Sequence, residues 1–126
     1  PNDPMLLERI ENLNRNAKGF LAVGKVLQAM KCYETVVLIR PNDPVAIHNF
    51  GMCLKRIGKL DLAEKVLKRA VELNAKDGEA RASAYVGLAR AALLKDDVEA
   101  AKGYATVVMT LFEKTKAAED AKEILQ

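Results

Sequence analysis

The chain has 126 residues, a formal net charge of +3 and 50% hydrophobic residues, which suits one globular domain. It contains no run of about 20 apolar residues that could span a membrane, and its charge excess is too small to indicate a nucleic-acid partner. Ala, Leu, Glu, Lys and Arg supply 65 of the 126 residues, a composition typical of long helices. Two cysteines are too few for a disulfide framework and favour a reducing compartment, so we expect a cytoplasmic protein.

A first helical hairpin is predicted over residues 10–43, with a turn at Gly24-Lys25. Its second helix carries an apolar face at helical spacing, formed by Ala29, Tyr33 and Val36. The tetrapeptide PNDP occurs at residues 1–4 and again at 41–44. Proline is well accommodated in the first turn of a helix. If both copies open a helix, the first helix is therefore extended by about six residues. We also expect that the chain is a fragment of a longer protein.

A second hairpin is predicted over residues 44–77. Asp43 is a good N-cap, and Pro44 suits the first helical position. Gly58 is expected to end the first helix, because glycine adopts the backbone conformation that follows a helix most easily. Two apolar faces recur at helical spacing: the first is Ile47, Phe50, Gly51 and Leu54, and the second is Leu60, Ala63, Val66, Leu67, Ala70 and Leu73.

A third hairpin is predicted over residues 82–115, with a turn at Asp96-Asp97. Four extra residues, 78–81, are expected to lengthen a helix. The buried face of the second helix has two possible registers, which are Ala101, Ala105 and Val108, or Ala100, Tyr104 and Val107. Residues 116–126 are polar with a narrow apolar face and are expected to form a helix that caps the end of the stack.

The 34-residue spacing of the second hairpin resembles the tetratricopeptide repeat. The pattern of that family falls on Ile47, Phe50, Gly51, Leu54, Ala63, Leu67, Ala70 and Ala75, of which Leu54, Leu67 and Ala75 replace its usual aromatic residues and proline. The resemblance implies an all-α fold, a right-handed superhelix of antiparallel helical hairpins. It also implies a non-catalytic scaffold whose first helices line a concave groove that binds a peptide or a partner segment.

Enzyme chemistry is not predicted. The segment from Gly19 to Lys25 has the spacing of a phosphate-binding loop, but Val26 follows where Ser or Thr would hold magnesium, and no strand precedes it. His48 is the single histidine, and the two cysteines are not at metal-ligand spacing. We therefore expect no catalytic residue, no cofactor and no metal.

The groove residues implied by the resemblance are rich in bases, which favours an acidic or carboxylate-bearing partner. They are Asn14, Arg15, Lys18, His48, Asn49, Met52, Lys55, Arg56 and Arg90. Some members of the family clamp the C-terminal carboxylate of cytosolic chaperones. Here Asn49 fills one clamp position, but Ser83 and Gly87 stand where Lys and Arg are needed. That ligand is not predicted.

Two other functions compete with peptide binding. The apolar segment Tyr104–Phe112 could mediate self-assembly into a homo-oligomer, since exposed apolar patches are sticky. A secretion chaperone of the same repeat type would need a more apolar groove than this one.

Overall fold

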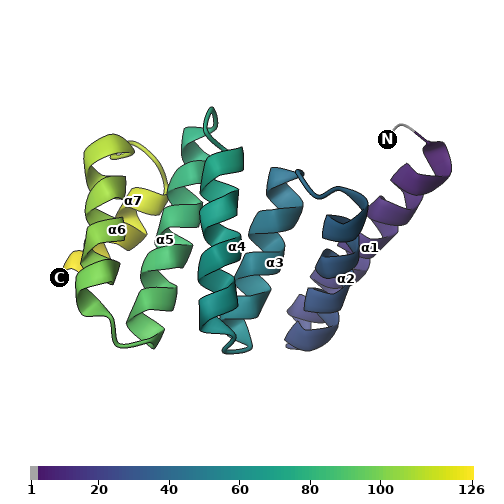
Figure 1. Cartoon of the computed structure of the whole chain (residues 1–126), viewed down its shortest axis with the longest axis horizontal. Coiled ribbons are helices and arrows are strands. Elements are labelled where there is room, and N and C mark those ends of the chain that lie inside the picture. Colours follow the sequence, from purple (N-terminus) through teal and green to yellow (C-terminus); the bar gives the residue numbers. More distant parts are fainter. Residues whose placement is uncertain (1–2) are drawn as a thin grey trace.

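A computed structural model describes residues 3–126 as a row of antiparallel helices, with no strand among them (Figure 1). This confirms the predicted all-α fold. The helices are α1 (Pro4–Ala22), α2 (Val26–Ile39), α3 (Pro44–Arg56), α4 (Leu60–Leu73), α5 (Gly78–Leu94), α6 (Val98–Leu111) and α7 (Ala117–Leu125). Successive helices pack into the hairpins α1/α2, α3/α4 and α5/α6, and α3 also contacts α5.

The helix starts follow from local sequence. Asp43 accepts hydrogen bonds from the backbone N–H groups of Val45 (3.0 Å) and Ala46 (3.2 Å), which satisfies donors that have no partner inside the helix. Asp3, Asp77 and Asp97 cap α1, α5 and α6 in the same way. The four caps explain why each of these helices begins where it does.

The turns inside the hairpins need a left-handed residue. Gly24 has φ +77° and Gly58 has φ +86°, a region that residues with a Cβ adopt at a cost. The third turn places Asp96 there instead, with φ 61°. Asp tolerates this conformation better than most residues, so all three hairpins use one kind of turn.

The first helices of the outer two hairpins are longer than that of the middle hairpin, α3, which has 13 residues. α1 has 19 residues and begins at the first PNDP copy, and α5 has 17 and includes residues 78–81. Both lengthenings agree with the expectation from sequence. In α6 the residues Ala101, Ala105 and Val108 are fully buried, which decides the register that the sequence left open.

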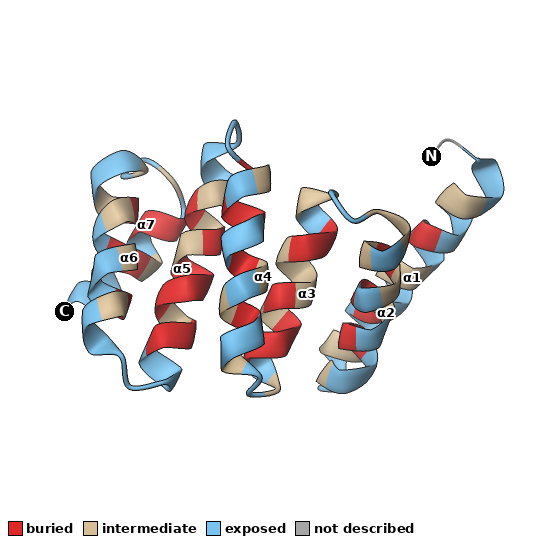
Figure 2. Ribbon diagram, in the orientation of Figure 1, coloured by how far each residue is buried: buried red, intermediate tan, exposed pale blue. Residues whose placement is uncertain are grey.

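The core lies where helices of neighbouring hairpins meet, as the buried residues in Figure 2 show. Leu67 of α4 is fully buried at its centre. A Cβ added at Gly51 would lie 2.9 Å from Leu67, and one at Gly87 would lie 3.3 Å from it. The two glycines therefore let α3 and α5 approach α4 closely, as small residues at helix crossings do.

Most of the apolar segment Tyr104–Phe112 packs inside the molecule. It is therefore not the free apolar surface that the self-assembly hypothesis assumed. Ala105 and Val108 are buried against α5 and α7. The Tyr85 ring packs at 6.4 Å from the Tyr104 ring and 6.3 Å from the Phe112 ring, measured between centroids. Leu111 is the large apolar residue of this segment that stays exposed.

Candidate functional site

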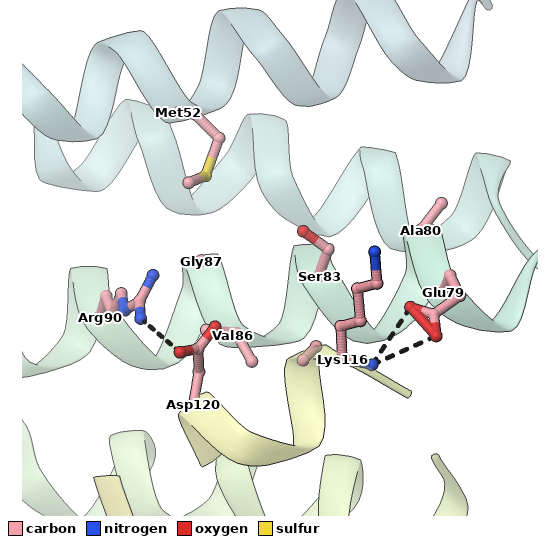
Figure 3. A pocket seen from close by; sticks show the side chains of 10 residues that line it. Met52, Glu79, Ala80, Ser83, Val86, Gly87, Arg90, Lys116 and Asp120 are labelled. Atoms are coloured by element: carbon pink, nitrogen blue, oxygen red, sulfur yellow. Dashed lines mark hydrogen bonds and ion pairs between the residues drawn. The ribbon is translucent and has the colours of Figure 1, made fainter. Parts of the chain in front are cut away.

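A cleft of about 390 Å³ runs along α5, with α3 on one side and α7 on the other (Figure 3). Its floor is α5, Met52 of α3 forms one wall, and α7 forms the opposite wall. The α5 residues that line it are Glu79, Ala80, Ser83, Val86, Gly87 and Arg90. The other lining residues are Lys116, the N-cap of α7, and Ala117 and Asp120 of α7.

Two polar contacts hold α7 against this cleft, one near each end of α5. The Glu79 carboxylate accepts hydrogen bonds from the backbone N–H of Lys116 at 3.2 and 3.3 Å, and it so caps the start of α7. Asp120 forms an ion pair with Arg90 at 3.3 Å. Buried alanines on α7 pack against α5 and α6 between these contacts. The last helix therefore packs against α5 and α6 and builds one wall of the cleft.

A smaller, mainly apolar pocket of about 110 Å³ continues the cleft toward the N-terminal ends of α3 and α5. It is lined by Pro44, Val45, His48, Asn74, Ala80 and Ser83. Ala80 and Ser83 line both hollows. The two hollows thus form one concave surface that follows α5 from its start to Arg90.

Lys55 of α3 is an unusual charge, although it lines neither hollow. Only 9% of the residue is exposed, and burial followed by the nearby Arg90 and Arg56 charges lowers the pKa of its ammonium. Among residues 3–126, no carboxylate lies within 4.0 Å of that ammonium. Lys55 is therefore a crowded cation that lacks an acidic partner within the described chain.

His48 lies on the same face of α3 as Lys55, two turns before it, at the edge of the apolar pocket. Burial, and then the Lys55 charge, lower the pKa of its imidazole below the ordinary value of 6.5. The side chain is thus neutral at pH 7, which suits its apolar surroundings.

The pKa of His48 predicts a loss of stability in weak acid. A base whose pKa is lowered by folding binds its proton more readily when unfolded, so stability falls as pH drops from about 7 through 6.5 toward the folded pKa. The groups that face His48 are Lys55, Asn74 and Ser83; the last two carry no group that ionises in this range. Urea unfolding at pH 7.5 and 5.5 should show a larger decline for the wild type than for His48→Gln. An equal decline in both would contradict the prediction.

The structure separates the predicted groove residues into two groups. His48, Met52 and Arg90 line the two hollows. Lys55 and Arg56 line neither, although the Arg90 and Arg56 charges both lower the pKa of Lys55. Asn49, half-buried on α3, and the α1 residues line neither hollow. Those α1 residues are Asn14, which is half-buried, Arg15, which bonds Asn12 at 2.8 Å, and Lys18, which is exposed.

Sequence reasoning missed the contribution of α7. Glu119 and Asp120 are adjacent carboxylates on α7, and Glu119 pairs with Lys122 on its own helix, at 3.6 Å. Asp120 instead reaches Arg90 across the cleft. No spacing in the sequence indicates that contact, because it depends on how α7 folds back on α5.

Membrane-spanning helices and clusters of metal-binding side chains would each indicate a class of function in residues 3–126. No helix there is both long and apolar enough to cross a bilayer. Nor do three or more His, Cys, Asp or Glu side chains gather in that part of the chain as they would around a metal ion.

Comparison with known proteins confirms the resemblance seen in the sequence. Residues 45–77 match the family model of the tetratricopeptide repeat. Among curated proteins, the BBSome complex member BBS4 of Bos taurus is 29% identical over 91 residues, which is 72% of this chain. The match takes up 17% of that relative, so the chain spans less than a fifth of its length.

Solved structures of similar fold are repeat domains of the same kind. The first such domain of Spaghetti (RPAP3), bound to an HSP90 peptide, superposes with a TM-score of 0.75 at 24% identity, covering 93% of this chain and 90% of its own. The second domain of human RPAP3, in complex with an HSP70 peptide, gives 0.76 at 22% identity, covering 94% and 97%. The N-terminal domain of stress-induced protein-1 from C. elegans gives 0.77 at 15% identity, covering 99% and 100%.

Residues 45–77 thus form a tetratricopeptide repeat, and the chain as a whole has the fold of tetratricopeptide-repeat domains, a right-handed superhelix of helical hairpins.

Proposed function

We propose that this chain is a non-catalytic interaction module that binds an extended segment of another protein on the concave surface along α5. In this proposal the hairpins are three repeats, at about residues 10–43, 44–77 and 82–115, and residues 116–126 cap them. The module belongs to a longer protein, as the length of its curated relative suggests. Repeat solenoids commonly bind partners on their concave side.

The observation that carries the proposal is the concentration of bases at one end of this surface. Arg90 lines the cleft, and its charge and that of Arg56 both lower the pKa of the buried Lys55. Among the ion pairs of residues 3–126, the one that involves these three bases joins Arg90 to Asp120 of α7. Such a surface attracts acidic segments and orients them. Two domains of similar fold were solved with peptides bound, which supports a peptide as the partner.

The chaperone peptides of those relatives are not proposed as ligands here. The clamp that would hold a terminal carboxylate needs bases where this chain has Ser83 and Gly87, and a side chain at Gly87 would meet Met52 at 3.0 Å. The basic residues of this groove lie farther along α3 and α5. We therefore place the acidic part of the ligand at Lys55 and Arg90.

Selection from a displayed library of random eight-residue peptides tests the proposal. We expect enrichment of acidic sequences, whose binding weakens about tenfold or more in the double variant Lys55→Glu/Arg56→Glu and fades as salt rises. The matched control is Lys65→Glu/Lys68→Glu on α4, where neither lysine forms an ion pair within the described chain. A library that yields no binder, or binders that only the α4 variant weakens, would contradict the proposed groove.

A further inference from the structure

One face of α1 has no helix packed against it. α1 lies at one end of the row of helices (Figure 1), and among the described helices it contacts only α2. By contrast, α3 also packs against α2 of the preceding hairpin, and α5 packs against α4 in the same way. The uncovered face of α1 holds a hollow of about 380 Å³, lined by Met5, Glu8, Arg9, Asn12, Leu13 and Asn16.

This face is polar where the corresponding helices are apolar. Phe50 lies 34 residues after Asn16, and Leu88 takes the same position in the third hairpin. Phe50 packs against the cluster that contains Tyr33 of α2, and the buried Leu88 packs beside Leu67 of α4. Asn16 is exposed. A helix that packed here in the same way would bury the Asn16 amide, which is costly without a hydrogen-bond partner. The face therefore suits a partner that offers polar groups.

The middle of this face is a line of three residues that differ in size. Met5, Asn12 and Gly19 are seven residues apart, which is about two helical turns, so they follow one another along α1. All three are exposed. A Cβ added at Gly19 would meet nothing within 4 Å. The line thus has a large apolar side chain at one end, an amide at its centre and open space at the other end.

Two opposite charges flank this line on the same side. Glu8 and Arg15 are also seven residues apart, one before Asn12 and one after it. Arg15 donates a hydrogen bond to the Asn12 side-chain oxygen at 2.8 Å, which holds its guanidinium beside the line. That group has further donors to offer a carboxylate. Within residues 3–126, neither Glu8 nor Arg15 forms an ion pair.

A second α1 laid antiparallel across the first would match both features. With a two-fold axis at Asn12, Met5 of each copy faces the open space at Gly19 of the other. Glu8 of each copy faces Arg15 of the other, and the two Asn12 amides can donate to and accept from each other. Each contact occurs twice, as in any two-fold dimer. A second copy of this chain is therefore the partner that this face complements.

We propose that the chain forms an antiparallel two-fold dimer through the uncovered face of α1, with Glu8 of each copy paired to Arg15 of the other. The interface is separate from the cleft along α5, so this inference goes beyond the proposed function. It names a surface and an occupant that peptide binding does not require.

The size of the face indicates a weak dimer. α1 has 19 residues, so it is about 28 Å long, and a helix with its side chains is about 10 Å wide. One such strip is well below the roughly 800 Å² per partner of a stable interface. A polar Asn at the centre fixes the register of paired helices at a cost in strength. We therefore expect dimerisation that depends on concentration and is visible below about 1 mM protein.

Sedimentation equilibrium of the 126-residue chain, up to about 1 mM, tests the dimer. The wild type should approach twice the monomer mass as concentration rises. Glu8→Arg and Arg15→Glu each place like charges together at both ends of the interface, so each should weaken dimerisation about tenfold or more. The double variant Glu8→Arg/Arg15→Glu restores both pairs in reversed order. It should dimerise within about threefold of the wild type, as intact charge pairs predict.

Mixing the two single variants tests the register more strictly. In a heterodimer of Glu8→Arg with Arg15→Glu the introduced charges oppose one another, so the mixture should associate more tightly than either variant alone. The matched control is Glu11→Arg, which reverses an exposed carboxylate on another face of α1. It should dimerise as the wild type does.

Three results would overturn the proposal. They are a wild type that stays monomeric up to about 1 mM, single variants that dimerise as the wild type does, and a double variant or mixture in which association is not restored. The exposed residues changed here lie outside the cleft along α5, so each single variant should keep the unfolding midpoint and the library-peptide binding of the wild type. Failure of the dimer would thus leave the proposed function standing.

Discussion

Replacing Gly51 by Leu is expected to lower the free energy of unfolding by about 3 kcal/mol, the upper part of the range for overpacked cores. A Cβ at this position would lie 2.9 Å from the Cδ2 and Cγ atoms of Leu67 and 3.1 Å from a Val66 methyl group. Both neighbours belong to α4, and Leu67 is fully buried, so α3 and α4 must separate to admit the side chain. Urea unfolding followed by circular dichroism measures the change.

Gly103 provides the matched control for this prediction. It lies within α6, and a Cβ added there would meet nothing within 4 Å. Gly103→Ala should therefore stabilise the chain by about 0.5–1 kcal/mol, since glycine is a poor residue in a helix interior. If Gly51→Leu proved neutral while Gly103→Ala behaved as expected, the close contact of α3 with α4 would be disproved.

Leu67→Ala is expected to cost about 2–5 kcal/mol, because it removes a large buried side chain and leaves a cavity. Leu67 is fully buried and reaches both α3, at Gly51, and α5, at Gly87. The cavity would thus loosen the contact between two neighbouring hairpins. The same urea experiment measures it, and a cost below about 1 kcal/mol would show that the site collapses around the smaller residue.

The two positions should also be coupled. In an otherwise wild-type chain, the Cβ added by Gly51→Ala would lie 2.9 Å from two side-chain atoms of Leu67. Leu67→Ala removes both of these atoms. Gly51→Ala should therefore destabilise the wild type and become less harmful, or stabilising, in the Leu67→Ala background. A double-mutant cycle measures this coupling. Strict additivity would mean that the two residues do not compete for the same space.

Local chemistry determined most of the fold. Asp43 before Pro44 predicts the start of α3, and Gly58 predicts its end, because caps and left-handed turns depend on a few adjacent residues. Apolar spacing indicated which face of each helix is buried. It left the register of α6 undecided, since alanines occupy adjacent positions at 100 and 101 and small residues fit either face. Packing against α5 and α7 decided it.

The positions of three bases on first helices were also foreseeable. The resemblance placed Lys55, Arg56 and Arg90 there, and α3 and α5 carry them. What only the tertiary structure decided was the burial of Lys55, the cleft wall formed by α7, and the contact of Asp120 with Arg90. These features join residues 30 or more positions apart. Sequence periodicity reports the face of one helix, whereas such contacts depend on the angle and distance at which whole helices pack.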